Sequence, residues 1–528
     1  MREVANLIER LERDIPQLIE QFDIPGMAVG VCDATQLLWT RGFGTMRRGG
    51  DHAVTPQTLF SIQSCSKVYT ATVVLVAVQQ GLVELDAPIT TYLPGFSVQS
   101  RFEQQPEAKI TLRHLLTHSA GFTHEAPVGS NYKVGKASFS AHCQSISATW
   151  LRFPVGHHQE YSNLGIDLAA YILQVARGLP FPRFVDRYLL QPLDMRRTTL
   201  DHNAISRDAD RAVGHSKQLG KHLPERIPMV GAGGVYTTVE DACRYLQFQL
   251  AEGESLLDPG LLAEMSRLPG CDDGQISGYG AGLMVMRAGG ALAHGHGGRG
   301  FGFLADLYWM PVEGFGVAVL TNSVDHPQGS LVKGVMKELS TSTFSAPSLR
   351  PPIQLKRDAI ERLCGEYVGR GDTIAVLRMD GEGPSFWIDE EPKVIRFVDE
   401  RAFMIGDEAR ETYRFLMDDT SDIPRYLQCV DNGGVWYRND VPRLPADLPA
   451  NVDDVWNRRY VVRSNGLPVQ TIRLIRDNDI TILDPQDSIP LRLREHRQGI
   501  YYSAMGEVLD LTDNPPAYAN LALHPMAQ

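Results

Sequence analysis

The 528-residue sequence predicts a mixed α/β region followed by an all-β C-terminal third. Helical and strand-like apolar patterns alternate over about the first 340 residues, whereas from about residue 360 only short β-type runs separated by turns occur. Two proline-bearing segments, Pro347 to Pro352 and Val441 to Pro449, separate these parts. Because so long a chain exceeds the size of one hydrophobic core, we expect several domains.

Composition restricts the kinds of partner. The net charge of −12, without a Lys/Arg-rich run, disfavours nucleic acid. No apolar run approaches the ~18 residues of a membrane span, and the charged N-terminal segment does not resemble a signal peptide. The seven cysteines lie far apart, which is typical of free thiols in a reducing compartment. We therefore expect a cytoplasmic protein with a small-molecule or peptide substrate and without nucleic-acid or membrane partners; homo-oligomer formation stays open.

The N-terminal residues predict a helix followed by the start of a sheet. Residues 1 to 22 form an amphipathic pattern in which Pro16 would kink or split the helix. Two strand-like runs, Met27 to Cys32 and Leu37 to Thr40, are joined by a polar turn through Asp33. This arrangement predicts a β-hairpin.

A Ser-x-x-Lys pair, Ser64 and Lys67, lies where an extended run gives way to the helical pattern Val68 to Val78. A serine in the first turn lies near free backbone N–H groups, and a lysine three residues later shares its face of the helix. Serine needs a base within hydrogen-bond reach, and an amine serves if its pKa is lowered. The pair is a candidate nucleophile and base, although an isolated Ser-x-x-Lys is more often an exposed serine beside a solvated lysine.

The next helix start contains two histidines. Thr111 is placed to cap a short helix that Gly121 ends. His114 and His118 have the i,i+4 spacing of metal ligands, but no glutamate lies beside His114 and no third ligand is evident. We interpret both histidines as packing or capping residues and predict no metal site.

Three further segments carry polar residues beside apolar elements. Tyr161 and Asn163 precede the apolar helix Ile166 to Ala176, where the simplest interpretation is a half-buried tyrosine and a helix cap. Thr237, with Glu240 three residues later, has the form of a capping box. A glycine-rich run, Leu292 to Phe303, precedes strand-like segments and suggests close backbone approach.

Taken together, three of these segments resemble the active-site motifs of the penicillin-recognising serine hydrolases, which include class C β-lactamases, D,D-peptidases, D-aminopeptidases and esterases. The motifs are Ser64-x-x-Lys67, Tyr161-Ser162-Asn163 and His296-Gly297-Gly298. The resemblance covers about residues 5 to 340. It implies a β-lactamase/transpeptidase-like α/β (α+β) sandwich with a helical subdomain over residues 1–346.

The resemblance also implies a role for each motif residue. Ser64 would attack a carbonyl and become acylated, while Lys67 and Tyr161 would share the proton relay, and which of them is the base stays open. Asn163 would bind Lys67 or the substrate amide. The backbone N–H groups of Ser64 and Arg299 would form the oxyanion hole. No cofactor is implied.

The third motif departs from the Lys-Thr-Gly of many β-lactamases and D,D-peptidases. His296, Gly297 and Gly298 supply no hydroxyl, and an ordinary imidazole is mostly neutral at pH ~7. Recognition of a substrate carboxylate would be weakened, although Arg299 would restore part of it. The sequence therefore favours the branch that contains D-aminopeptidases, amidases and esterases, with His296, Gly298 and Arg299 in the substrate site.

The C-terminal third contains two similar halves. Tyr367-Val368 before Thr373 to Arg378 parallels Tyr460-Val461 before Thr471 to Arg476. We predict two antiparallel β-barrels, at residues 354–440 and 450–528, with one larger β-domain as the alternative. Their tandem arrangement resembles that of D-aminopeptidase relatives, whose accessory barrels border the active site and restrict substrate length.

The leading functional prediction is a cofactor-free serine hydrolase that acts through an acyl-enzyme on small amides, D-residue peptides or esters. An acyltransferase or peptide cyclase using the same acyl-enzyme is one alternative, because the motifs do not determine whether water or an amine takes the acyl group. A non-catalytic binding protein that retains the fold is the other.

Overall fold

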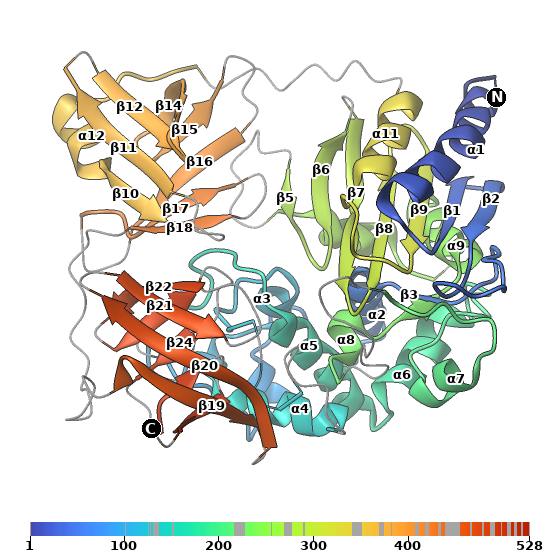
Figure 1. Ribbon diagram of the computed structural model, residues 1–528, viewed down its shortest axis with the longest axis horizontal. Helices are drawn as coiled ribbons and strands as arrows, with labels where there is room; N and C mark the ends of the chain where they lie inside the picture. The colour runs from blue at the N-terminus through green and yellow to red at the C-terminus, as the bar shows by residue number, and fades with distance from the viewer. Residues whose placement is uncertain are drawn as a thin grey trace.

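The structure is a computed structural model of the 528-residue chain (Figure 1). It describes all residues except 1, 101, 125, 127, 130–136, 150, 152, 216–227, 255, 269–276, 289–290, 341–350, 369–373, 382, 407–410, 418–421, 431–433, 439–454, 465–466, 478–479, 486–490, 498, 504–507, 512–514, 519–520 and 527–528. The predicted link Val441 to Pro449 and most of Pro347 to Pro352 lie outside the described residues.

The N-terminal part is built on a seven-stranded antiparallel sheet with the strand order β2-β1-β9-β8-β7-β6-β5. The predicted hairpin is confirmed, because Met27 in the first strand pairs with Phe43 in the second. The strands are β1 (Gly26–Asp33), β2 (Leu37–Gly44), β5 (Gly278–Tyr279), β6 (Met284–Ala288), β7 (Ala291–Gly300), β8 (Phe303–Met310) and β9 (Phe315–Thr321). A separate two-stranded sheet pairs β3 (Phe60–Ser61) with β4 (Tyr236–Thr237).

Helices cover both faces of the seven-stranded sheet (Figure 1). Side chains alternate between the faces along β1, so that Val29 packs with α1 and α11 while Cys32 packs with α9. The helices of this part are α1 (Arg2–Phe22), α2 (Ser66–Gln79), α3 (Leu112–Leu116), α4 (Phe139–Ser145), α5 (Asn163–Arg177), α6 (Phe181–Val185), α7 (His202–Arg207), α8 (Val230–Gly233), α9 (Val239–Leu250), α10 (Pro259–Ala263) and α11 (Ser330–Leu339). Every residue of β8 is buried, as expected for a strand covered on both sides.

Three details of the helix boundaries differ from the sequence prediction. Pro16 lies inside α1, which is one continuous helix. The cap of α9 is Thr238, whose hydroxyl accepts from Asp241 N, because Thr237 belongs to β4. The helix begun by Thr111 ends at Leu116, well before Gly121. In each case the local pattern gave the right element, and for α9 the pairing of β4 with β3 accounts for the shifted cap.

The C-terminal third contains two further antiparallel sheets. The first has nine strands in the order β13-β12-β11-β10-β18-β17-β16-β15-β14, preceded by α12 (Arg357–Leu363). Its strands are β10 (Gly365–Val368), β11 (Ile374–Asp380), β12 (Gly383–Ile388), β13 (Glu391–Lys393), β14 (Ile395–Asp399), β15 (Ala402–Ile405), β16 (Glu411–Leu416), β17 (Tyr426–Cys429) and β18 (Val435–Arg438). Among the residues that the structure describes, its edge strands β13 and β14 are not paired with each other, so this sheet is not the closed barrel that we expected. Only Val394 separates β13 from β14, too few residues for a hairpin turn.

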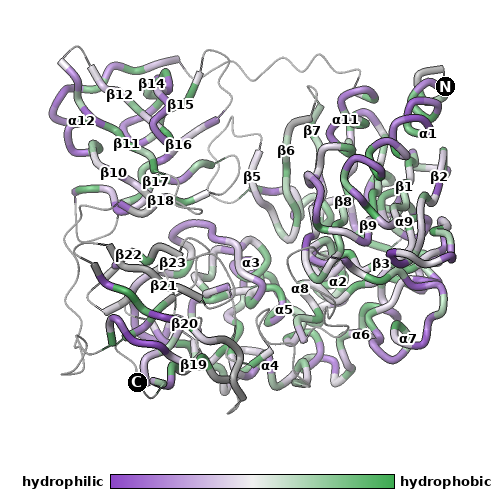
Figure 2. The backbone as a smooth tube through the Cα atoms, in the orientation of Figure 1, coloured by the Kyte–Doolittle hydropathy of each residue, from purple (hydrophilic) through white to green (hydrophobic). Residues whose placement is uncertain are grey.

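The second C-terminal sheet closes on itself, since its first strand pairs with its last. Its strands are β19 (Arg458–Ser464), β20 (Leu467–Asp477), β21 (Ile480–Pro485), β22 (Leu491–Arg497), β23 (Ile500–Ser503), β24 (Val508–Asp510), β25 (Ala517–Tyr518) and β26 (Leu521–Pro525). Each sheet has its own apolar core, and Figure 2 shows hydrophilic residues prevailing on the peripheral helix α12. Of the helices that the structure describes, none has the length and apolar character to cross a membrane.

Candidate active site

Ser64 lies in a short 3-10 turn, Gln63–Cys65, that connects β3 to α2. Gln63 has a φ of 48°, a left-handed conformation that is uncommon for a residue other than glycine. Its amide donates to Ser61 Oγ at 2.8 Å, and Cys65 N donates to Ile62 O at 3.0 Å. These bonds hold the tight turn that presents the Ser64 hydroxyl at the start of α2.

Lys67 is fully buried, and its amine has three acceptors. Nζ lies 3.0 Å from Ser64 Oγ, 2.8 Å from Asn163 Oδ1 and 3.0 Å from Ala232 O. A neutral amine in this place can accept the Ser64 proton while its own two N–H groups bond to Asn163 and Ala232. The structure therefore brings together the hydroxyl and the amine that the sequence analysis paired.

Tyr161 lies beside this amine, with Lys67 Nζ 4.8 Å from the centroid of its ring. The following residue, Ser162, is the N-cap of α5, whereas a cap was the simplest local interpretation of Asn163. The Asn163 side chain binds Lys67, one of the two partners that the family resemblance implies. Ser162 Oγ accepts from Leu164 N at 3.2 Å and donates to Thr123 O at 2.6 Å. Because Ser162 does the capping, the Asn163 side chain is free to bind Lys67.

His118 belongs to the site, although its spacing from His114 had suggested a common structural role. His114 forms the predicted cap with Thr111, but α3 ends before His118, so the two histidines do not share a helix face. The His118 ring lies 4.5 Å from Tyr161 and 4.6 Å from Tyr279. Burial, followed by the positive charge of Lys67, holds the pKa of His118 well below its usual value, so the imidazole is neutral.

His296 lies on β7 and is enclosed by the protein. Its Nδ1 donates to Gly297 O at 2.5 Å, and its Nε2 accepts from Tyr279 Oη at 2.9 Å. Burial, with a smaller effect of Lys67, lowers the pKa of His296 to about 3. Both ring nitrogens are thus occupied, and a direct hydrogen bond from His296 to a substrate requires Tyr279 to move.

Gly298 carries β7 against the turn that holds Ser64. A Cβ at Gly298 would overlap Ile62 O and lie 3.1 Å from Ser64 N. Cys65 Sγ donates to His296 O at 3.0 Å across the same contact. Arg299 is exposed, and in the described part of the chain its guanidinium makes no hydrogen bond or ion pair. The predicted roles of Gly298 and Arg299 in substrate binding stay predictions.

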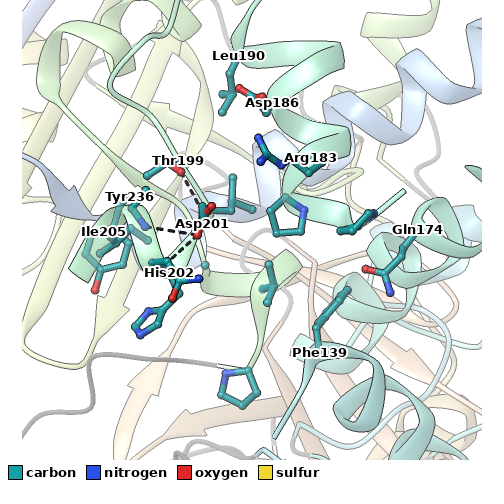
Figure 3. A pocket seen from close by; sticks show the side chains of 18 of the residues that line it. Phe139, Gln174, Arg183, Asp186, Leu190, Thr199, Asp201, His202, Ile205 and Tyr236 are labelled. Atoms are coloured by element: carbon teal, nitrogen blue, oxygen red, sulfur yellow. Dashed lines mark hydrogen bonds between the residues drawn. The ribbon is translucent and has the colours of Figure 1, made fainter. Parts of the chain in front are cut away.

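Among the described residues, no cluster of three or more His, Cys, Asp or Glu is placed to hold a metal ion. A separate cavity of about 580 Å³ lies among α5, α6, α7 and α8 (Figure 3). Asp201, which accepts from Asn203 N, and Tyr236 are on its wall. Val230 also lines it, whereas Ala232 in the same helix contacts Lys67, so α8 separates this cavity from the site.

The contact at Gly298 gives a first prediction. Gly298→Ala should reduce the rate at which a fluorophosphonate labels Ser64 by about 10²-fold, because the added methyl displaces the turn and small misplacements of reacting groups are costly. Gly334→Ala is the matched control, since a Cβ there meets no atom within 4 Å and α11 tolerates it. Equal labelling of both variants would contradict the packing described here.

Burial of His296 gives a prediction about pH. In the unfolded chain its pKa returns to ~6.5, so between ~6.5 and the folded value of about 3 the unfolded state binds more protons, and the free energy of unfolding falls as pH is lowered. His296→Gln should show a smaller loss of stability between pH ~7 and pH ~4.5 in urea unfolding. His52→Gln, at an exposed site, should keep the wild-type slope.

Comparison with known proteins agrees with this geometry. The Beta-lactamase family matches residues 11–335, more than half of the chain. The chain is 28% identical to the D-alanyl-D-alanine-carboxypeptidase/endopeptidase AmpH of Escherichia coli (strain K12), over 43% of this chain and 57% of AmpH. It is also 28% identical to Esterase EstB of Burkholderia gladioli, over 50% of this chain and 73% of EstB. The chain thus spans little more than half the length of AmpH.

Solved structures show the same fold. The structure of SurE, 21% identical in sequence, covers 83% of this chain and 100% of SurE with a TM-score of 0.58. The octameric penicillin-binding protein homologue from Pyrococcus abyssi, 20% identical, covers 82% of this chain and 100% of that chain with a TM-score of 0.56. Given the family match over residues 11–335, the chain belongs to the Beta-lactamase family and has the β-lactamase/transpeptidase-like fold.

Proposed function

We propose that the protein hydrolyses small amides or esters, among them peptides with a D-residue, through an acyl-enzyme on Ser64. The observation that carries the proposal is the 3.0 Å contact between Ser64 Oγ and the buried amine of Lys67. A serine hydroxyl becomes a competent nucleophile when a base lies within hydrogen-bond reach, and the amine meets this condition.

The proposed reaction has two steps. Ser64 Oγ bonds to the substrate carbonyl carbon, the bond from that carbon to the leaving nitrogen or oxygen breaks, and the Ser64 proton passes through Lys67 and Tyr161 to the leaving group. A water oxygen then bonds to the acyl carbon, the bond from that carbon to Ser64 Oγ breaks, and the proton that the water loses passes through the Lys67–Tyr161 pair to Oγ, which releases the acid and restores the free enzyme. Because Lys67 Nζ lies 4.8 Å from the centroid of the Tyr161 ring, we assign the role of base to the pair and not to either residue alone.

The neutral surroundings of the amine support a substrate without a carboxylate at this position. His118 and His296 are uncharged. The residue after His296 is Gly297, so the threonine hydroxyl of Lys-Thr-Gly motifs is replaced by a glycine. Among similar proteins, EstB is named an esterase, and one SurE structure contains D-Leu. We therefore place the substrates among D-aminoacyl amides and simple esters rather than penicillins.

The decisive test is labelling of the full chain with a fluorescent fluorophosphonate, followed by hydrolysis assays on matched D- and L-aminoacyl amides and p-nitrophenyl esters. We expect labelling that Ser64→Ala abolishes and preferential hydrolysis of the D-aminoacyl amides. An added amine measures how much acyl group goes to an acceptor other than water. Absence of labelling in the wild type would overturn the proposal in favour of a binding protein.

The nine-stranded sheet contacts the loop that carries Tyr161. His157 Nε2 donates to Met417 O at 2.6 Å, and the ring of Tyr426 lies 4.9 Å from that of His158. In the same loop, Gln159 Nε2 donates to Tyr279 O at 2.7 Å. The loop is thus held between the accessory sheet and the catalytic part, which supports a role of this sheet in restricting substrate size.

Tyr426→Ala tests this role. Loss of the ring contacts, worth ~0.5–1.5 kcal/mol per aromatic pair, should loosen the loop and raise kcat/KM for long relative to short substrates up to about tenfold. Trp387→Ala is the control, because Trp387 lies in β12 of the same sheet and contacts Arg378 instead of the loop. An unchanged ratio of the two kcat/KM values in Tyr426→Ala would exclude the sheet from substrate selection.

A further inference from the structure

A buried carboxylate lies behind the site, on the helix that supplies Asn163. Asp167 follows Asn163 by four residues on α5, so both side chains lie on one face of the helix. Asp167 Oδ1 accepts from Gly231 N at 2.8 Å and from Ala232 N at 3.0 Å. Neither the sequence motifs nor the mechanism above uses this residue.

The other carboxylate oxygen faces a buried histidine. Asp167 Oδ2 lies 3.2 Å from His142 Nε2, and both side chains have no exposed surface. His142 Nδ1 lies 2.7 Å from Val128 O, which can only accept, so Nδ1 carries a proton. A second proton on Nε2 avoids a contact between two lone pairs. Two backbone N–H groups donate to Asp167 Oδ1 and favour its carboxylate form, so we assign the pair as an imidazolium and a carboxylate.

This pair is connected to Lys67 through α8. The peptide group between Gly231 and Ala232 is bonded at both ends, because its carbonyl accepts from Thr70 Oγ1 at 2.7 Å and its N–H donates to Asp167. Ala232 O then accepts from Lys67 Nζ. Removing the carboxylate would leave two buried N–H groups without an acceptor, and α8 would shift to satisfy them.

We infer that Asp167, charge-balanced by His142, is a positioning residue that holds the Ala232 carbonyl on the Lys67 amine, so that one face of α5 sets two of the three Lys67 acceptors. The inference rests on the proposed function, since it assigns Asp167 a part in the activation of Ser64. Asp167 touches neither the substrate nor the reacting atoms.

The charged groups around Asp167 and Lys67 determine the expected effect of substituting His142 or Asp167. The titratable groups that the described residues place beside Asp167 are His142 and Cys143 of α4. Without the imidazolium, the Asp167 carboxylate is uncompensated and favours the ammonium form of Lys67 across α8. An asparagine at 167 can instead accept from both N–H groups and donate to a neutral His142. The titratable groups beside Lys67 itself are Ser64, Cys65, His118, Tyr161 and His296.

The experiment measures the rate of Ser64 acylation by a fluorophosphonate against pH, in the full chain. Asp167→Ala should slow acylation by about 10²-fold, and Asp167→Asn should recover most of the loss. His142→Asn should move the acidic limb of the profile to higher pH by about one unit. Asp241→Ala is the matched control, because Asp241 is also buried and accepts from two backbone N–H groups, at Arg197 and Thr198.

Each outcome separates this inference from the proposed function. Wild-type protein that is not labelled overturns both. If the wild type is labelled and a folded Asp167→Ala variant is acylated as fast as the wild type, the inference alone is overturned. The inference alone is also overturned if Asp241→Ala slows acylation as much as Asp167→Ala does. If Asp167→Ala does not fold in a thermal melt, His142→Asn decides, and a wild-type pH profile in that variant overturns the inference.

Discussion

The buried amine of Lys67 is the constraint on which the site depends. A lysine with no exposed surface must find acceptors for its N–H groups, because an unpaired buried amine costs several kcal/mol. Its three acceptors come from the turn before α2, from α5 and from α8, and Asn163 is 96 residues distant in sequence. The chain cannot bury Lys67 favourably unless these three segments meet. Burial of Lys67 in the folded state therefore requires the contacts that form the site.

Close backbone packing keeps these segments in place. Gly298 brings β7 onto the Ser64 turn, and Gly282, with a φ of +74°, brings the loop before β6 onto α2, where a Cβ would lie 2.8 Å from Lys67 O. Larger residues would separate the sheet from the helix at the two points that flank the amine. The sheet thus fixes the position of α2, while Tyr161 approaches Lys67 from the loop that the accessory sheet contacts at His157 and His158.

The sequence predicted what depends on local spacing. It located the Ser64 turn, the amphipathic first helix, the hairpin of β1 and β2, and an all-β C-terminal third. The local interpretation of Asn163 as a helix cap is wrong, because Ser162 caps α5 and the Asn163 side chain binds Lys67. The sequence analysis interpreted His118 as a packing or capping residue. Only the fold shows that α3 ends before His118 and that its ring lies against Tyr161. Asp167 carries no local signal at all, because its partners in α4 and α8 are far away in the chain.

The electrostatic balance follows from this packing. Burial keeps the pKa values of His118 and His296 low, so neither imidazole carries charge near neutral pH, and the nearby Asp167 is already paired with His142. Lys67 and Tyr161 are thus the groups around Ser64 between which a proton can move without creating a second unpaired charge. In the proposed reaction, such a transfer in a site of low polarity is coupled to the charge that develops on the substrate oxygen, which the predicted oxyanion hole at the Ser64 and Arg299 N–H groups would stabilise. On the proposed mechanism, the low polarity around Lys67 therefore couples its proton transfer to the attack by Ser64 on the carbonyl.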